Sequence, residues 1–359
     1  MDLITISEAC RLLGVSRPTL DSYRKKYNLQ TSKFGGKIRL SKTEVIKKIL
    51  LSQNETPERY TLSIFGGSYI RQIEPIPGVY DLRKIKGIDA FGVMALLCSI
   101  KAYLNHNELN EVHLLLDGSP FCSYLESIGF FAEVERSHRD RVSCDYSLLK
   151  KIPQTRVAVI LPLHLIGYRG AEKKILNELY DPLLKQGFSE SCCGYIGWIV
   201  GELCDNAHTH SEGPCYLIVE ALQKSSTETR YLSIAIGDTG IGIPVSLKKN
   251  TRYENEEDRR LLPMAFKSEV SRMEVEPKRG KGLNDIIGIS KGNRSCLRVE
   301  SNNLAVMFDF RKNASELEFV APIVQTPGTR FCLLLIDAEF KEVPRIEVNN
   351  VINEFLERI

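Results

Sequence analysis

Apolar residues recur along the chain at two kinds of spacing, one typical of strands and one typical of helices. Strands are expected at the short apolar runs 79–82, 111–116, 157–162, 231–236, 295–300, 304–310 and 330–335. Helices are expected at 8–13, 16–27, 93–103, 123–130, 171–180, 201–211, 283–289 and 348–358. The pattern predicts an α+β multidomain protein, in which the later strands form an antiparallel sheet.

A length of 359 residues is enough for two or three domains. We expect units at 1–52, 60–135 and 151–341, a charged connector at 136–150 and a closing helix at 342–359, which docks on the sheet or on a second copy. The sequence shows no apolar run of transmembrane length and no signal-peptide pattern, so we expect a cytoplasmic protein without membrane contact. Its ten cysteines are scattered and fit buried, reduced thiols.

The first fifty residues combine helix signals with positive charge, since they hold eleven Lys and Arg against four Asp and Glu. Ser7 is expected to cap a first helix, and Pro18 stands early in a second. Gly35 and Gly36 predict a hairpin, and Ser41 with Glu44 predicts a capping box.

This segment resembles the winged helix-turn-helix of MerR-like regulators and phage excisionases, whose second helix enters the major groove. The resemblance implies binding to duplex DNA. Groove contacts would come from Arg17, Thr19, Ser22, Tyr23 and Lys26, and backbone contacts from Lys33, Lys37 and Arg39. The alternative is a basic, solvated helical domain that binds a protein.

In the middle of the chain, strand and helix signals alternate around Asp89-Ala-Phe-Gly92. The pattern resembles a STAS domain, the fold of anti-sigma-factor antagonists, whose switch motif is close to Asp-Ser-Ser-Gly. Ala90 and Phe91 replace the hydroxyl residues, so the implied role is a scaffold or a docking site for a protein partner.

Chemistry-bearing residues gather in the last two hundred positions. Asp238 ends an apolar strand and is followed by Gly240 and Gly242, which would let a flat ligand lie close to the backbone. Glu202 and Asn206 are four residues apart and therefore share a helix face, where an amide oxygen can bind Mg²⁺ beside a carboxylate base. His208 and His210 point to different sides of that helix, which argues against a shared metal ion.

Four motifs in order resemble the GHKL superfamily of Bergerat-fold ATPases, which includes histidine kinases and anti-sigma-factor kinases. They are Glu202-x-x-x-Asn206, Asp238-x-Gly240-x-Gly242, Gly280-Lys281-Gly282-Leu283 and Gly328-Thr329. The resemblance implies an α/β sandwich that binds ATP and Mg²⁺.

The same resemblance implies a role for each residue. Asp238 would accept a hydrogen bond from the adenine amino group, assisted by Thr329, and Asn206 would hold Mg²⁺. Glu202 would activate the attacking water or hydroxyl. The second glycine motif would present backbone N–H groups to the phosphates, and Lys281 would add charge. Residues 245–281 match the family's ATP lid, although Pro277 departs from the longer form of the second glycine motif.

We therefore expect a regulator that binds and hydrolyses ATP and couples its nucleotide state to DNA or to a protein partner, reached through the STAS-like unit or the lid. A homodimer is a further option. The alternatives are a protein serine kinase of the anti-sigma type and a non-catalytic DNA-binding adaptor.

Overall fold

The computed structural model describes residues 3–13, 15–46, 48, 59–66, 70–74, 77–149, 157–168, 170, 172–211, 214–223, 230–271, 282–311, 317–320, 326–337 and 340–359. Within these residues the chain is a mixed α+β protein with several sheets, as the apolar pattern predicts.

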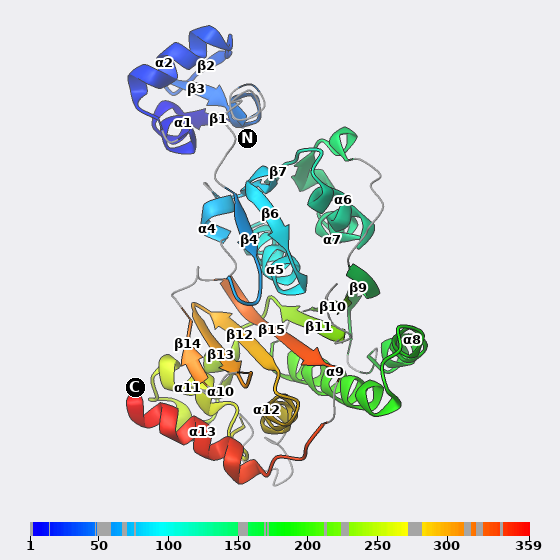
Figure 1. The fold of residues 1–359 in the computed structure, drawn as a ribbon. Helices are drawn as coiled ribbons and strands as arrows, with labels where there is room; N and C mark the ends of the chain where they lie inside the picture. Colours follow the sequence, from blue (N-terminus) through cyan, green and yellow to red (C-terminus); the bar gives the residue numbers. More distant parts are fainter. Residues whose placement is uncertain are drawn as a thin grey trace.

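The largest element is a seven-stranded antiparallel sheet with the order β14-β13-β12-β15-β11-β10-β9 (Figure 1). Its strands are β9 (Val157–Ile166), β10 (Cys215–Gln223), β11 (Arg230–Asp238), β12 (Cys296–Asn302), β13 (Leu304–Asp309), β14 (Leu317–Phe319) and β15 (Thr326–Ile336). Five of them include an expected strand, while β10 and β14 were not expected. The sheet is buried on both faces, which explains its nearly continuous apolar runs.

One face of the sheet is covered by helices of the same C-terminal region. They are α8 (Glu172–Lys185), α9 (Glu190–His210), α10 (Ile243–Leu247), α11 (Asp258–Met264), α12 (Gly282–Gly292) and α13 (Arg345–Arg358), with a 3₁₀ turn, η5, at Thr251–Tyr253. Alternate strand residues such as Phe331, Leu333 and Leu335 join these helices in one core. The closing helix α13 packs on α11, α12 and β14 of its own chain.

The other face is covered by α5 (Ala90–His106), which contacts β10, β11 and β15. This helix is apolar on nearly all sides because it is enclosed between the sheet and its own unit. Its approach to β11 is close: a Cβ added at Gly237 would lie 2.6 Å from the Cγ of Met94. The segment expected to form a separate unit therefore shares a core with the large sheet.

The rest of the middle unit is built from short parallel ladders. Strand β4 (Tyr60–Leu62) pairs with β6 (Ile85–Ile88), and β7 (Val112–Leu115) lies between β5 (Val79–Asp81) and β8 (Val142–Cys144). The helices are α4 (Ile70–Ile73), α6 (Pro120–Ser127) and α7 (Phe130–Glu135), with 3₁₀ turns η2 (Leu82–Lys84), η3 (Arg139–Arg141) and η4 (Tyr146–Leu148). Residues 136–150, expected to be a connector, thus contribute β8 to this unit.

The N-terminal unit contains β1 (Leu3–Thr5), α1 (Ile6–Leu13), α2 (Arg17–Lys26), β2 (Thr31–Phe34), β3 (Lys37–Ser41) and α3 (Lys42–Val45), with the sheet order β1-β3-β2. The expected cap at Ser7 is wrong, because α1 starts earlier: the Glu8 amide donates to the Thr5 hydroxyl and the Thr5 amide to the Glu8 carboxylate. The cap at Ser41 is confirmed, since its hydroxyl accepts from the Glu44 amide at 3.1 Å. Gly35 and Gly36 have φ of 59° and 74°, which forms the expected hairpin turn.

In the part of the chain that the structure describes, no helix combines the length and the apolar character needed to cross a membrane.

Candidate functional site

A cavity of about 420 Å³ opens on the face of the large sheet that α9, α10 and α12 cover. This volume lies in the range of small-molecule sites. Seven of the predicted site residues line it: Glu202, Asn206, Asp238, Gly242, Gly282, Leu283 and Thr329. They come from α9, β11, the turn before α10, the start of α12 and β15, so folding brings together positions up to 127 residues apart.

Asp238 is a buried carboxylate in the cavity wall, with only 4% of its surface exposed. Its Oδ1 accepts from the amides of Gly240 at 2.9 Å and Thr329 at 3.2 Å. Burial raises the pKa of Asp238 to about 6, against the opposing effects of these two hydrogen bonds and of the positive charge of Arg330. Gly328 makes this approach possible, because it has a φ of 92° and a Cβ there would lie 2.0 Å from the Asp238 carbonyl oxygen.

Thr329 lies beside Asp238 and is tied to the neighbouring strand. Its hydroxyl lies 3.3 Å from that of Ser301, which also accepts from the Ile243 amide at 2.8 Å. These contacts fix the start of α10 against β12 and β15. The polar end of the cavity is therefore held by hydrogen bonds from three elements.

The long helix α9 forms one wall of the cavity. It is capped by the Ser189 hydroxyl, which accepts from the Cys192 amide at 3.2 Å. Glu202 and Asn206 lie on the same face, as their spacing predicts. Burial raises the pKa of Glu202, with further contributions from the charges of Asp205 and Asp285.

Neither Glu202 nor Asn206 has a side-chain hydrogen bond to another described residue. The Glu202 carboxylate lies against the first residue of α12, where a Cβ at Gly282 would fall 1.9 Å from Oε2. Only glycine at this position leaves space for the carboxylate in its present place. The first turn of α12 and the acid on α9 are thus fitted to each other.

Gly240 does not line the cavity. A Cβ at Gly240 would lie 1.8 Å from the Ser211 carbonyl oxygen, which accepts from the Ile241 amide at 3.0 Å. Its role in the structure is to let the turn after β11 pass the end of α9. Gly242 has a φ of 81° and does line the cavity. Gly280 and Lys281 lie outside the described residues, as does Pro277.

The described part of the wall is acidic. Glu202, Asp205, Asp238 and Asp285 line it, while none of the described lining residues is Lys or Arg. Among the described residues no group of three or more His, Cys, Asp or Glu could hold a metal ion by itself. An ion with few protein ligands, completed by water and ligand oxygens, is the kind that fits this wall.

Several lining residues were not predicted. Trp198, Asp205 and Thr209 lie on the face of α9 that carries Glu202, so extending the helical period along α9 would have found them. Ile243, the first residue of α10, also lines the cavity, and the remaining residues come from the expected lid, whose described part up to residue 271 contains packed helices; these are Ser246, Leu247, Ala265, Val270 and Ser271. His210 also lines the cavity, and His208 lies within hydrogen-bond distance of the carbonyls of Cys204 and Ile166.

The residues predicted to contact DNA lie on two elements of the N-terminal unit. Arg17, Ser22 and Lys26 are exposed on α2, where Thr19 and Tyr23 are partly buried. Lys33 and Lys37 are exposed on the hairpin and Arg39 is partly buried. Thr19 also takes part in the helix cap, because its amide donates to the Ser16 hydroxyl. Helix α2 and the hairpin thus present several positive side chains to solvent.

Comparisons of the chain with protein-family models, with curated proteins and with solved structures gave no match.

Proposed function

We propose that the chain binds ATP with Mg²⁺ in the cavity between α9, β11, α12 and β15, hydrolyses it slowly, and uses its nucleotide state to control binding of DNA or a protein partner. In this proposal the C-terminal region is a GHKL-type domain, the middle unit is STAS-like and the N-terminal unit is a winged helix-turn-helix. The observation that carries it is the convergence of seven predicted residues on one cavity.

The polar end of the cavity suits a purine base. A buried carboxylate accepts hydrogen bonds, and both amide donors among the described residues bind Oδ1 of Asp238, which leaves Oδ2 for a ligand. The exocyclic amino group of adenine is a matching donor. Thr329, at the same end, provides a hydroxyl for a second polar contact or for a bridging water.

The opposite wall suits a hydrated cation and phosphates. Asn206 would hold Mg²⁺ through its amide oxygen, and the ion would offset phosphate charge against the acidic wall. Glu202 would orient or deprotonate the attacking water, and burial, by raising the pKa of its carboxylate, makes it a stronger base. Backbone amides at the start of α12 and Lys281 would meet the phosphates.

The N-terminal unit supplies the proposed DNA contacts. Arg17, Thr19, Ser22, Tyr23 and Lys26 on α2 would enter the groove, while Lys37 and Arg39 on the hairpin would contact the backbone. The antiparallel sheet β1-β3-β2 and the short α1–α2 connection support the winged helix-turn-helix assignment. For the middle unit, the three-stranded parallel ladder around β7 supports an α/β partner-docking module.

ATP turnover by the wild-type chain and by Glu202→Ala, each with and without duplex DNA, tests the proposal. We expect slow release of phosphate to water, a loss of about 100-fold or more in the variant, and a change in rate when DNA is added. Phosphate appearing on a serine of a partner would favour the kinase. An Ala variant that regulates as well as the wild type would favour the non-catalytic adaptor.

A further inference from the structure

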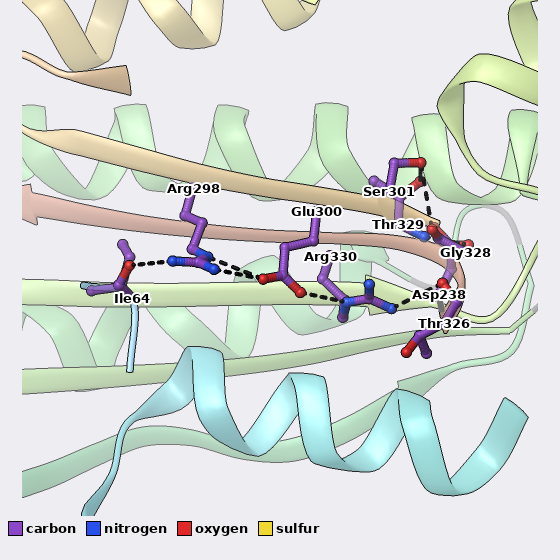
Figure 2. A network of polar contacts seen from close by, with 9 residues as sticks. All are labelled: Ile64, Asp238, Arg298, Glu300, Ser301, Thr326, Gly328, Thr329 and Arg330. Atoms are coloured by element: carbon purple, nitrogen blue, oxygen red, sulfur yellow. Dashed lines mark hydrogen bonds and ion pairs between the residues drawn. The ribbon is translucent and has the colours of Figure 1, made fainter. Parts of the chain in front are cut away.

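A row of charged side chains crosses the face of the sheet opposite the cavity (Figure 2). Arg298 and Glu300 project from β12 and Arg330 from β15, and each is at most 2% exposed. Thr329 and Phe331, on either side of Arg330, line the cavity on the other face. One strand, β15, therefore carries both the cavity wall and this row.

The three side chains form one ion-pair network, in which the Glu300 carboxylate is shared by the two arginines. The Nε and Nη2 of Arg298 donate to Oε1 of Glu300 at 3.1 and 2.8 Å. The Nε of Arg330 donates to Oε2 of the same carboxylate at 3.3 Å. Figure 2 shows Glu300 between the two guanidinium groups. Both carboxylate oxygens are thus used, and the position of each arginine depends on Glu300.

One end of the row reaches the cavity at Asp238. Arg330 is paired across the β11–β15 ladder with Gly237, directly before Asp238, and its Nη1 donates to the Thr326 carbonyl at 3.5 Å at the Asp238 end of the row (Figure 2). The positive charge of Arg330 opposes the effect of burial on the pKa of Asp238. The state of the Asp238 carboxylate therefore depends on where that guanidinium lies.

The other end reaches the middle unit. The Nη1 of Arg298 donates to the Ile64 carbonyl at 3.2 Å, and its guanidinium carbon lies 4.7 Å from the ring centre of Phe91. The Ile64 amide donates at 2.9 Å to Asp89, whose other oxygen accepts from the Gly92 amide and caps α5. The Asp89-x-x-Gly92 segment thus begins the helix that covers this face of the sheet.

The buried row also requires negative charge near its two ends, at the cavity and at the middle unit. Two arginines and one glutamate leave one excess positive charge in a region closed to water, and such a charge requires a nearby partner. Asp238 lies at the Arg330 end, and Asp89 acts electrostatically on the Arg298 end. The charges alternate in sign from the cavity to the N-terminus of α5, so displacing one changes the balance for its neighbours.

We propose that Arg330, held by Glu300 and Arg298, is a positioning residue that orients the Asp238 carboxylate toward the purine base, and that base recognition thereby depends on the middle unit at Ile64 and Asp89. This inference rests on the proposed nucleotide site. Binding free energies are reciprocal, so a nucleotide that engages Asp238 also stabilises the contact at the start of α5.

The test is the ratio of dissociation constants for inosine triphosphate and ATP, which differ at the group that faces Asp238. Wild type is expected to prefer ATP by about 10- to 100-fold, the range for a buried polar group left without its partner. Arg330→Lys and Glu300→Gln should lower this preference for ATP to within about threefold. A structural change unrelated to Asp238 would instead lower the affinity for both nucleotides equally. Asp309→Asn is the matched control, because Asp309, the last residue of β13, forms a two-point ion pair with Arg311 just beyond that strand.

Two further measurements separate the possible failures. In the Asp238→Asn background, Arg330→Lys should leave the ratio unchanged; an equal effect in both backgrounds would overturn the positioning role. Amide exchange at Ile64 and Gly92 should slow when ATP binds wild type, and unchanged exchange would overturn the link to the middle unit. If Asp238→Asn lowers the preference but Arg330→Lys and Glu300→Gln do not, this inference fails while the proposed nucleotide site stands.

Discussion

Replacing Gly282 with alanine separates nucleotide binding from turnover. The added Cβ would lie 1.9 Å from Oε2 of Glu202 and 2.6 Å from its Cδ. The φ of Gly282 lies outside the left-handed region, so alanine fits the backbone. The group that must move is the end of a flexible side chain, and the predicted response is displacement of the Glu202 carboxylate.

The size of the effect follows from this geometry. Moving Oε2 from 1.9 Å to an ordinary non-bonded distance of about 3.5 Å requires a shift of about 1.5 Å, and a misplacement of about 1 Å in a catalytic group already costs about 100-fold in rate. This corresponds to about 3 kcal/mol in the activation free energy. The folded state should lose little, since alanine at a helix position is favoured over glycine by up to about 1 kcal/mol.

The assay compares Gly282→Ala with Gly288→Ala on the same helix. A Cβ at Gly288 would make only ordinary contacts, 3.6 Å from the Val343 carbonyl oxygen and 3.8 Å from a Val348 methyl carbon. Urea unfolding, ATP affinity and single-turnover phosphate release are measured for both variants. We expect near wild-type stability in both and a loss of rate in Gly282→Ala alone. Wild-type turnover in a folded Gly282→Ala variant would refute the role given to Glu202.

Three more results are expected. Burial raises the pKa of Asp238 to about 6 from its ordinary 3.8, so its contribution to stability is complete below about pH 4 and is lost as the pH rises through 6, by about 3 kcal/mol. Urea unfolding should show a smaller decline in stability over this pH range in Asp238→Asn. The affinity of the wild type for ATP should fall as the pH drops from 7.5 to 5.5. Gly328→Ala should destabilise the fold by more than about 2 kcal/mol, because φ is 92° and the Cβ would meet backbone. Gly129→Ala, with φ of 80° and open space, should cost only about 1 kcal/mol; equal losses would contradict the clash. Lys37→Ala, exposed on the hairpin and proposed to contact the DNA backbone, should weaken duplex DNA binding across sequences and lower the salt slope by about one, whereas Lys174→Ala, exposed on α8, should not.

Much of the cavity follows from local sequence rules. A four-residue spacing was sufficient to place Glu202 and Asn206 on one helix face, and an acid at the end of an apolar run was sufficient to place Asp238 at a strand end. Glycines beside these residues mark close backbone approaches that the structure contains. These rules act over one or two turns of chain, which explains why they succeed.

The arrangement of the units does not follow from the same rules. The sequence of α5 is apolar on nearly all sides, which indicates burial but not the surface that buries it. Arg298, Glu300 and Arg330 look like positions on a solvent-exposed face of their strands, and only the docking of α5 makes them buried. Some of the contacts come from distant segments, since Arg298 donates to the carbonyl of Ile64, which lies 234 residues away in the sequence.

The central claim is that the cavity around Asp238 holds ATP. A calorimetric titration of the full chain with ATP and Mg²⁺ tests it most directly, with the fluorescence of Trp198, the single tryptophan and a residue of the cavity wall, as a second signal. We predict saturable binding of one nucleotide per chain, a change in Trp198 emission, and a large loss of affinity in Asp238→Asn. Absence of saturable binding in the wild type, or equal affinity in the variant, would contradict the account.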